Sequence, residues 1–182
     1  MGGVTALLPV FARDILEAGP LGLGMLRAAP AIGGMSVALY LGAFPMRSRV
    51  GSAMFATVAL IAVAIIVFGL STVLWISVVA LIVMGGADMA SVYIRWTLVQ
   101  LWTPDHVRGR VSAVTGVSAS GSTELGDFRA GVSAALIGPV AAVVVGGVTI
   151  LAVVALWMRL FPELAGISSL SKAEATERNS RG

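Results

Sequence analysis

The chain has 182 residues, of which 58% are hydrophobic and only 12% are charged, and its mean hydropathy is +0.97. Soluble globular domains carry about 25% charged residues, and a soluble chain of this length would still expose roughly a third of its unfolded surface. The composition therefore excludes a soluble single domain. It also excludes a disordered chain, which needs low hydrophobicity and high charge. The absence of cysteine excludes disulfides and thiolate chemistry, and a net charge of +3 spread among long apolar runs excludes the basic stripe that nucleic-acid binding needs.

The length of the uncharged runs predicts how often the chain crosses a lipid bilayer, because a spanning helix needs about 20 mostly apolar residues. Residues 28–46 are nearly long enough for one crossing on their own, and residues 50–87 suffice for two, with a break at Gly69-Leu70-Ser71-Thr72. Residues 130–158 are too long for one crossing and are divided at Gly138-Pro139. Five complete membrane helices are therefore expected, at residues 20–45, 50–69, 73–101, 108–137 and 139–160.

The two ends of the chain differ from this pattern. Residues 1–12 are apolar but would reach only about 18 Å as a helix, so we expect them to be the second half of a spanning helix. Residues 165–182 are polar and are expected to form a disordered tail. The sequence thus predicts an all-α membrane domain over residues 1–164, with five complete helices and one partial helix, followed by the tail.

The basic residues predict the orientation of the chain, because lysine and arginine collect in cytoplasmic loops. With five spans, eight basic residues fall on one side of the membrane, and only Arg13 falls on the other, beside Asp14 and Glu17. The side with the basic loops and the C-terminus is therefore predicted to be cytoplasmic, and its basic residues are Arg47, Arg49, Arg108, Arg110, Arg159, Lys172, Arg178 and Arg181.

Six charged residues lie within the predicted spans, where charges are costly and nearly always face a bundle interior or an aqueous cavity. Counted from the loop at Asp105, Asp88 and Glu124 should lie within about 3 Å of the same depth. Our functional hypothesis is that these two carboxylates, with Asp127, form a protonatable transport site. Three arginines would then tune this site or bind anionic substrate groups: Arg27, Arg95 and Arg129.

A structural interpretation of the same six charges is equally open, because interhelical pairs of this kind also fix how a bundle packs. The uneven distribution of these charges among the helices also predicts which helices face lipid. The helices at 50–69 and 139–160 are free of charge until Arg159, so we expect them to face lipid while the other three line the interior.

Enzymatic function is not expected. The only histidine, His106, lies in a predicted loop, so a serine–histidine dyad or a histidine metal site has no second member. Gly85-Gly86-Ala87-Asp88 departs from an intramembrane aspartyl protease motif, since no glycine directly precedes the aspartate. No nucleotide-binding glycine motif occurs either. We therefore expect no catalytic residues, metal or cofactor.

Two motifs resemble one family of transporters. The first is Pro104-Asp105-x-x-Arg108-Gly109-Arg110, and the second is Leu125-Gly126-x-Phe128-x-Ala130-Gly131. Together with Gly86-Ala87-Asp88, Gly138-Pro139 and Leu160-Phe161-Pro162-Glu163-Leu164, they make essentially the whole chain similar to the C-terminal half of bacterial major facilitator superfamily transporters of the enterobactin-exporter-like branch.

The resemblance implies that the chain corresponds to helices seven to twelve of that fold, with helix seven truncated and the N-terminal six-helix half missing. It implies proton-driven export of a small molecule, such as a siderophore or drug, across the bacterial plasma membrane. The gating loops would contain Arg47 and Arg49, then Arg108, Gly109 and Arg110, although residues 42–51 lack the acidic residue of the family's gating motif. The alternatives are a non-transporting membrane scaffold and a truncated half that needs a partner chain.

Overall fold

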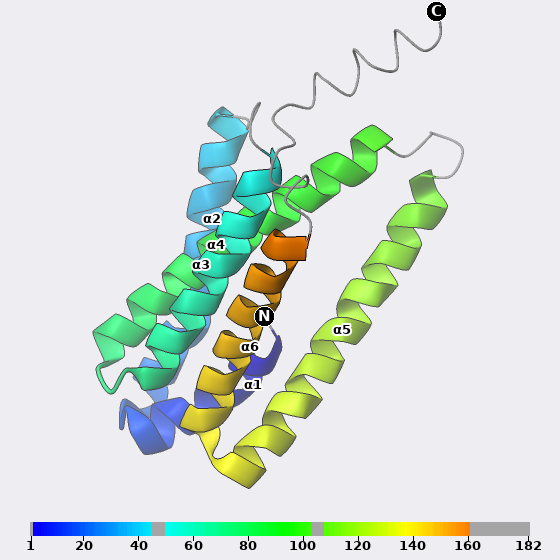
Figure 1. The fold of residues 1–182 in the computed structure, drawn as a ribbon. Coiled ribbons are helices and arrows are strands. Elements are labelled where there is room, and N and C mark those ends of the chain that lie inside the picture. The colour runs from blue at the N-terminus through cyan, green and yellow to red at the C-terminus, as the bar shows by residue number, and fades with distance from the viewer. Residues whose placement is uncertain (1, 45–49, 103–107, 161–182) are drawn as a thin grey trace, which may run out of the picture.

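The computed structural model describes residues 2–44, 50–102 and 108–160, and these parts of the chain are helical with no strand among them (Figure 1). The short helix α1 (Gly2–Val10) leads into a π-helical segment, η1 (Phe11–Ile15). Five long helices follow, and their bounds agree with the predicted ranges to within two residues: α2 (Gly19–Ala43), α3 (Val50–Leu70), α4 (Leu74–Trp102), α5 (Arg108–Ile137) and α6 (Pro139–Leu160).

Not all five long helices are apolar enough to qualify as membrane spans. Four have the length and hydropathy that a crossing requires, namely α2, α3, α4 and α6. Helix α5 has 30 residues, or about 45 Å of helix, yet serine, threonine, glycine and charged residues occupy many of its positions. The prediction of five spans is therefore confirmed for four helices, and α5 is long enough but too polar by the same measure.

Helix α4 packs against two of the other long helices. Helices α2 and α3 pack against it, α3 also packs against α6, and α5 packs mainly against α1 and α6. Figure 1 shows α5 close to the rest of the bundle at the turn into α6 and set apart from it toward its own beginning. The chain begins about halfway along the long helices, beside α5.

Glycine allows α2 and α4 to approach until their backbones touch. A Cβ atom at Gly33 would overlap the carbonyl oxygen of Ile82 and would lie 2.9 Å from the backbone nitrogen of Gly86. A Cβ atom at Gly85 would likewise overlap the backbone of Pro30. Such small-residue contacts are how membrane helices gain packing energy, because lipid offers no hydrophobic drive for them to associate.

The apolar core lies where α1 and η1 meet the long helices. Its largest buried side chains include Phe11 and Phe68, both with no exposed surface, and the centroids of their rings lie 4.6 Å apart. This aromatic pair joins η1 to α3, and Leu8, Leu26 and Met84 pack in the same cluster.

Replacing Phe11 with alanine is expected to destabilise the bundle by about 3 kcal/mol, because it removes a fully buried ring and leaves a cavity. Thermal unfolding of the purified protein in detergent measures this loss. Phe128→Ala is the control, since that ring is 73% exposed on α5 and should unfold like the wild type. Equal unfolding of the two variants would contradict the placement of Phe11 in the core.

Candidate functional site

A cavity of about 980 Å³ lies among α3, α4, α5 and α6, and α1 contributes Gly3, Val4 and Leu7 to its lining. The described residues that surround it fall into three groups, which are the charged residues, the hydroxyl residues of α5 and an apolar wall. Together they give the cavity one polar side and one apolar side.

Three of the six charged candidates line this cavity. Asp88 and Arg95 come from α4, where the lining positions Asp88, Ser91, Val92 and Arg95 recur at the three- and four-residue spacing of one helical face. Asp88 is half-buried, while Arg95 and the third residue, Arg129 of α5, are exposed. The structure thus places two cations and one carboxylate around a single cavity.

Arg129 extends from α5 toward α6. One of its terminal guanidinium nitrogens lies 3.8 Å from the point that a Cβ atom at Gly146 would occupy, and Gly146 lines the same cavity. The structure thus places the guanidinium group of Arg129 against the backbone of α6. Gly146, which the sequence analysis did not single out, leaves the room for it.

Helix α5 presents hydroxyl groups to the cavity. Thr115 donates a hydrogen bond to the carbonyl oxygen of Val111 (2.8 Å), Ser122 donates to that of Ser118 (2.7 Å), and Thr123 donates to that of Ala119 (3.0 Å). The sequence analysis missed this hydroxyl-bearing face. Its signal is the recurrence of small and hydroxyl residues every three or four positions of α5: Thr115, Ser118, Ala119, Ser122, Thr123, Gly126, Ala130 and Ser133.

The apolar wall of the cavity comes from helices α3 and α6. These helices were expected to face lipid only, because they carry no charge within their spans. In the structure they also form one wall of the cavity. A helix without charged residues can line a cavity when the helices opposite supply the polar groups. The wall consists of Met54, Val58, Ile61 and Ile65 of α3 and of Ala142, Val143 and Ile150 of α6.

The other three charged candidates lie outside the lining of this cavity. Arg27 on α2 and Glu124 on α5 are exposed. Asp127 is half-buried, and its Oδ1 atom is buried without a hydrogen-bond partner within the described part of the chain. The depth count that paired Asp88 with Glu124 could not choose between the faces of α5, so a role for Glu124 or Asp127 in proton coupling stays a prediction.

The six candidates form no ion pair with one another among the described residues. The only ion pair in that part of the chain joins Arg13 Nε to Asp14 Oδ1 at 3.6 Å, and both side chains are exposed. The interhelical ion pairs of the structural interpretation are not formed among the described residues, and Asp88, Arg95 and Arg129 line the cavity without direct contact between opposite charges.

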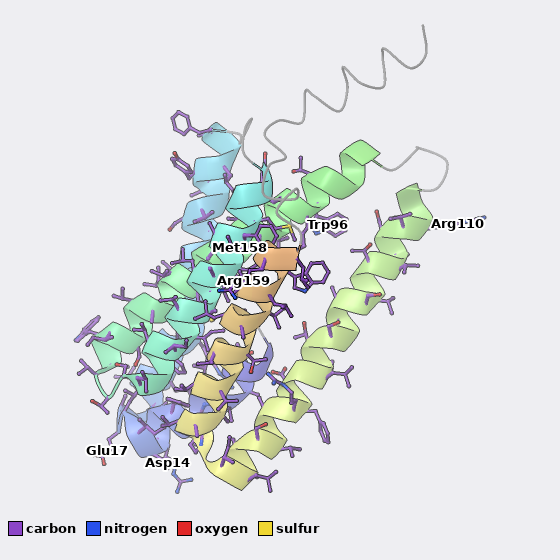
Figure 2. The ribbon with its side chains drawn as sticks, in the orientation of Figure 1. Asp14, Glu17, Trp96, Arg110, Met158 and Arg159 are labelled. Atoms are coloured by element: carbon purple, nitrogen blue, oxygen red, sulfur yellow. The ribbon has the colours of Figure 1, made fainter. Side chains whose placement is uncertain are left out.

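The candidate gating residues lie only partly in the described structure. Arg47 and Arg49 lie outside the described residues, whereas Arg108, Gly109 and Arg110 form the first turn of α5. Figure 2 shows Arg110 and Arg159 toward one end of the bundle and Asp14 and Glu17 at the other. Arg110 and Arg159 thus lie toward the end opposite Asp14 and Glu17, while Arg47, Arg49, Lys172, Arg178 and Arg181 lie outside the described residues. The assignment of the basic end to the cytoplasm stays a prediction.

Comparison with known proteins identifies the family. A family model described as "Transmembrane secretion effector", of the major facilitator superfamily type, matches residues 2–179. No curated protein and no solved structure gives a significant match. The match covers nearly the whole chain, and the described part of the structure supplies the apolar helices that such a transporter needs. The chain therefore belongs to the transmembrane secretion effector family of major facilitator transporters, and it is a multi-pass membrane protein.

Proposed function

We propose that this chain is the C-terminal half of a proton-driven exporter of small molecules such as siderophores or drugs, located in the bacterial plasma membrane with its C-terminus in the cytoplasm. In this proposal α5 is the fifth complete span, and its polar face is tolerated because it lines the cavity rather than lipid. A second six-helix half would close the transport pathway on the open side of the cavity. The resemblance of the whole chain to helices seven to twelve supports this assignment.

The observation that carries the proposal is the position of Asp88. This carboxylate lies within a helix that is apolar enough to span a membrane, and it lines a cavity with two arginines and several hydroxyl groups. Ionisable residues at membrane depth that face a cavity typically form proton or substrate pathways. Protonation from the outer face would neutralise Asp88, and release of the proton to the cytoplasm would restore its charge, so each transport cycle moves one proton inward.

Flux into inverted membrane vesicles tests the proposal, because the vesicle interior then corresponds to the outer face of the membrane. With the interior made acidic, vesicles from cells that produce the chain together with the six-helix half that completes the pathway should accumulate fluorescent amphiphiles, while vesicles from cells that lack the chain should not. The probes are rhodamine 6G as a cation and 8-anilinonaphthalene-1-sulfonate as an anion. Collapse of the pH gradient should abolish the uptake.

Two outcomes would contradict proton-driven export. Uptake that persists after the pH gradient has been collapsed would show transport without proton coupling. Equal dye content in vesicles with and without the chain would favour the non-transporting scaffold. A variant whose cavity charges are intact but whose surface charge is altered, Arg159→Ala, is the matched control for non-specific dye binding, since Arg159 is exposed and lies outside the described cavity lining.

A further inference from the structure

We infer that the cavity selects organic anions that also carry hydrogen-bond donor groups and an apolar surface. This inference rests on the proposed function, because it names the substrate class of the same cavity. Three independent features of the described lining residues support this inference. They are the sign of the net charge of the lining, the direction of the hydroxyl hydrogen bonds and the apolar wall. No one of these features alone defines the class of ligand.

The charged groups favour an anion. Among the described lining residues the ionisable side chains are Asp88, Arg95 and Arg129, which give a formal charge of +1. Arginine keeps its charge at any accessible pH and presents several N–H donors in a planar fork that matches a carboxylate, sulfonate or phosphate. Neither arginine forms an ion pair with a described residue, so both guanidinium groups are available to a ligand.

Three of the hydroxyl groups that α5 presents to the cavity favour hydrogen-bond donors on the ligand. A carbonyl oxygen can only accept, so the hydroxyls of Thr115, Ser122 and Thr123 must each donate their one proton to the backbone of α5. Each oxygen then offers only lone pairs to the cavity. A ligand N–H or O–H group would pair with these oxygens, whereas an ether or carbonyl group would face another acceptor.

The remaining wall sets the shape and polarity of the rest of the ligand. Ligand sites are typically clefts of about 300–1,000 Å³ with a mainly apolar lining and a few placed polar groups, and this cavity holds about 980 Å³. Met54, Val58 and Ile61 of α3 face the polar side with no charge among them. The substrate class is therefore an amphipathic anion with its donors and its charge on one side and an apolar group on the other.

Binding to the full chain in lipid nanodiscs tests the inference with three matched radiolabelled probes. N-acetyl-phenylalanine carries a carboxylate, an amide N–H and an aromatic ring. Its methyl ester lacks the anion, and its N-methyl analogue lacks the donor. We expect the acid to bind at least about tenfold more tightly than the ester, as the loss of a charge-assisted hydrogen bond implies. We expect a smaller loss for the N-methyl analogue.

Variants of the lining residues assign each preference to its side chain. Arg95→Ala and Arg129→Ala should each weaken binding of the acid by about tenfold while leaving the ester unchanged. Thr115→Val, which replaces a hydroxyl by a methyl group, should weaken binding of the acid but not of its N-methyl analogue. Arg159→Ala is the charge-matched control, because Arg159 is exposed on α6 and lies outside the described lining (Figure 2).

The chain has no cysteine, so a single Ser118→Cys substitution reports whether the cavity is open to water. Labelling of this cysteine by a membrane-impermeant maleimide, and protection by N-acetyl-phenylalanine, are the expected results. Absence of labelling would mean that protein or lipid fills the cavity, and it would overturn the inference.

The remaining outcomes separate this inference from the proposed function. Equal or tighter binding of the ester than of the acid overturns the substrate class alone, because the cavity then still binds a ligand. Failure of all three probes to bind overturns the inference about the cavity, whereas the flux measurement in vesicles decides the proposed function. Binding of the acid without any pH-driven flux in vesicles overturns proton-driven export and supports the selectivity of the cavity.

Discussion

Gly33→Ala is expected to separate α2 from α4 and to leave little folded protein. The added Cβ atom would overlap the carbonyl oxygen of Ile82 and lie 2.9 Å from the backbone nitrogen of Gly86. Both are backbone atoms, which cannot rotate away as a side chain can, so the two helices would have to move apart along their whole contact. Overpacking of this kind costs about 3 kcal/mol or more where the surroundings cannot yield. Size-exclusion chromatography and thermal unfolding in detergent measure the effect.

The same helix provides the control. Nothing lies within 4 Å of the position that a Cβ atom would take at Gly24, so Gly24→Ala adds the same methyl group without a clash. Alanine also favours the helical state over glycine by about 1 kcal/mol, so this variant should be as stable as the wild type or slightly more stable. Gly85→Ala should resemble Gly33→Ala, because its Cβ atom would overlap Pro30. Equal stability of Gly33→Ala and Gly24→Ala would contradict the close backbone contact.

The helix bounds were predictable because local chemistry sets them. Uncharged runs of spanning length locate the helices, and the sequence Gly138-Pro139 ends one helix and begins the next. The structure shows why: Gly138 has a φ of +87°, which glycine adopts without strain, and Pro139 is the first residue of α6, where the missing N–H costs nothing. The turn before α2 was not predictable, since Glu17 has a φ of +46°, a conformation that a side chain other than glycine's rarely adopts.

The residues that line the cavity could be predicted only in part. The depth of a side chain in the bilayer and the direction in which it points from its helix depend on different information. Counting residues along a helix gives the depth of a residue in the bilayer, and the two charged residues of α4, Asp88 and Arg95, do lie within a helix that is long and apolar enough to span a membrane. Direction depends on which face of each helix its neighbours cover. Thr115, Ser122 and Arg129 line the cavity while Glu124 does not, and this follows from the packing of α5 on α1 and α6, which no local pattern specifies. The hydroxyl periodicity of α5 was the one available signal.

Asp88→Asn is expected to reduce pH-driven accumulation in inverted vesicles to the level of vesicles that lack the chain. Asparagine has nearly the same shape as aspartate but cannot take up or release a proton, so the cavity keeps its volume while the coupling step is lost. Exchange of labelled for unlabelled probe at equal pH requires no net proton movement and should persist. The contrast between abolished gradient-driven uptake and retained exchange distinguishes a proton carrier from a residue that only holds the fold.

Two further acid-to-amide substitutions make the result specific to the cavity. Asp14→Asn removes a carboxylate that is exposed and paired with Arg13 outside the cavity, and Glu124→Gln removes one on α5 that lies outside the described lining. Asp14→Asn should retain gradient-driven uptake, because its carboxylate lies outside the described cavity lining. Glu124→Gln tests whether Glu124 has the predicted role in proton coupling. If Glu124→Gln abolished uptake and Asp88→Asn did not, the proton would pass along the face of α5 that points away from the cavity. The cavity would then serve substrate binding alone.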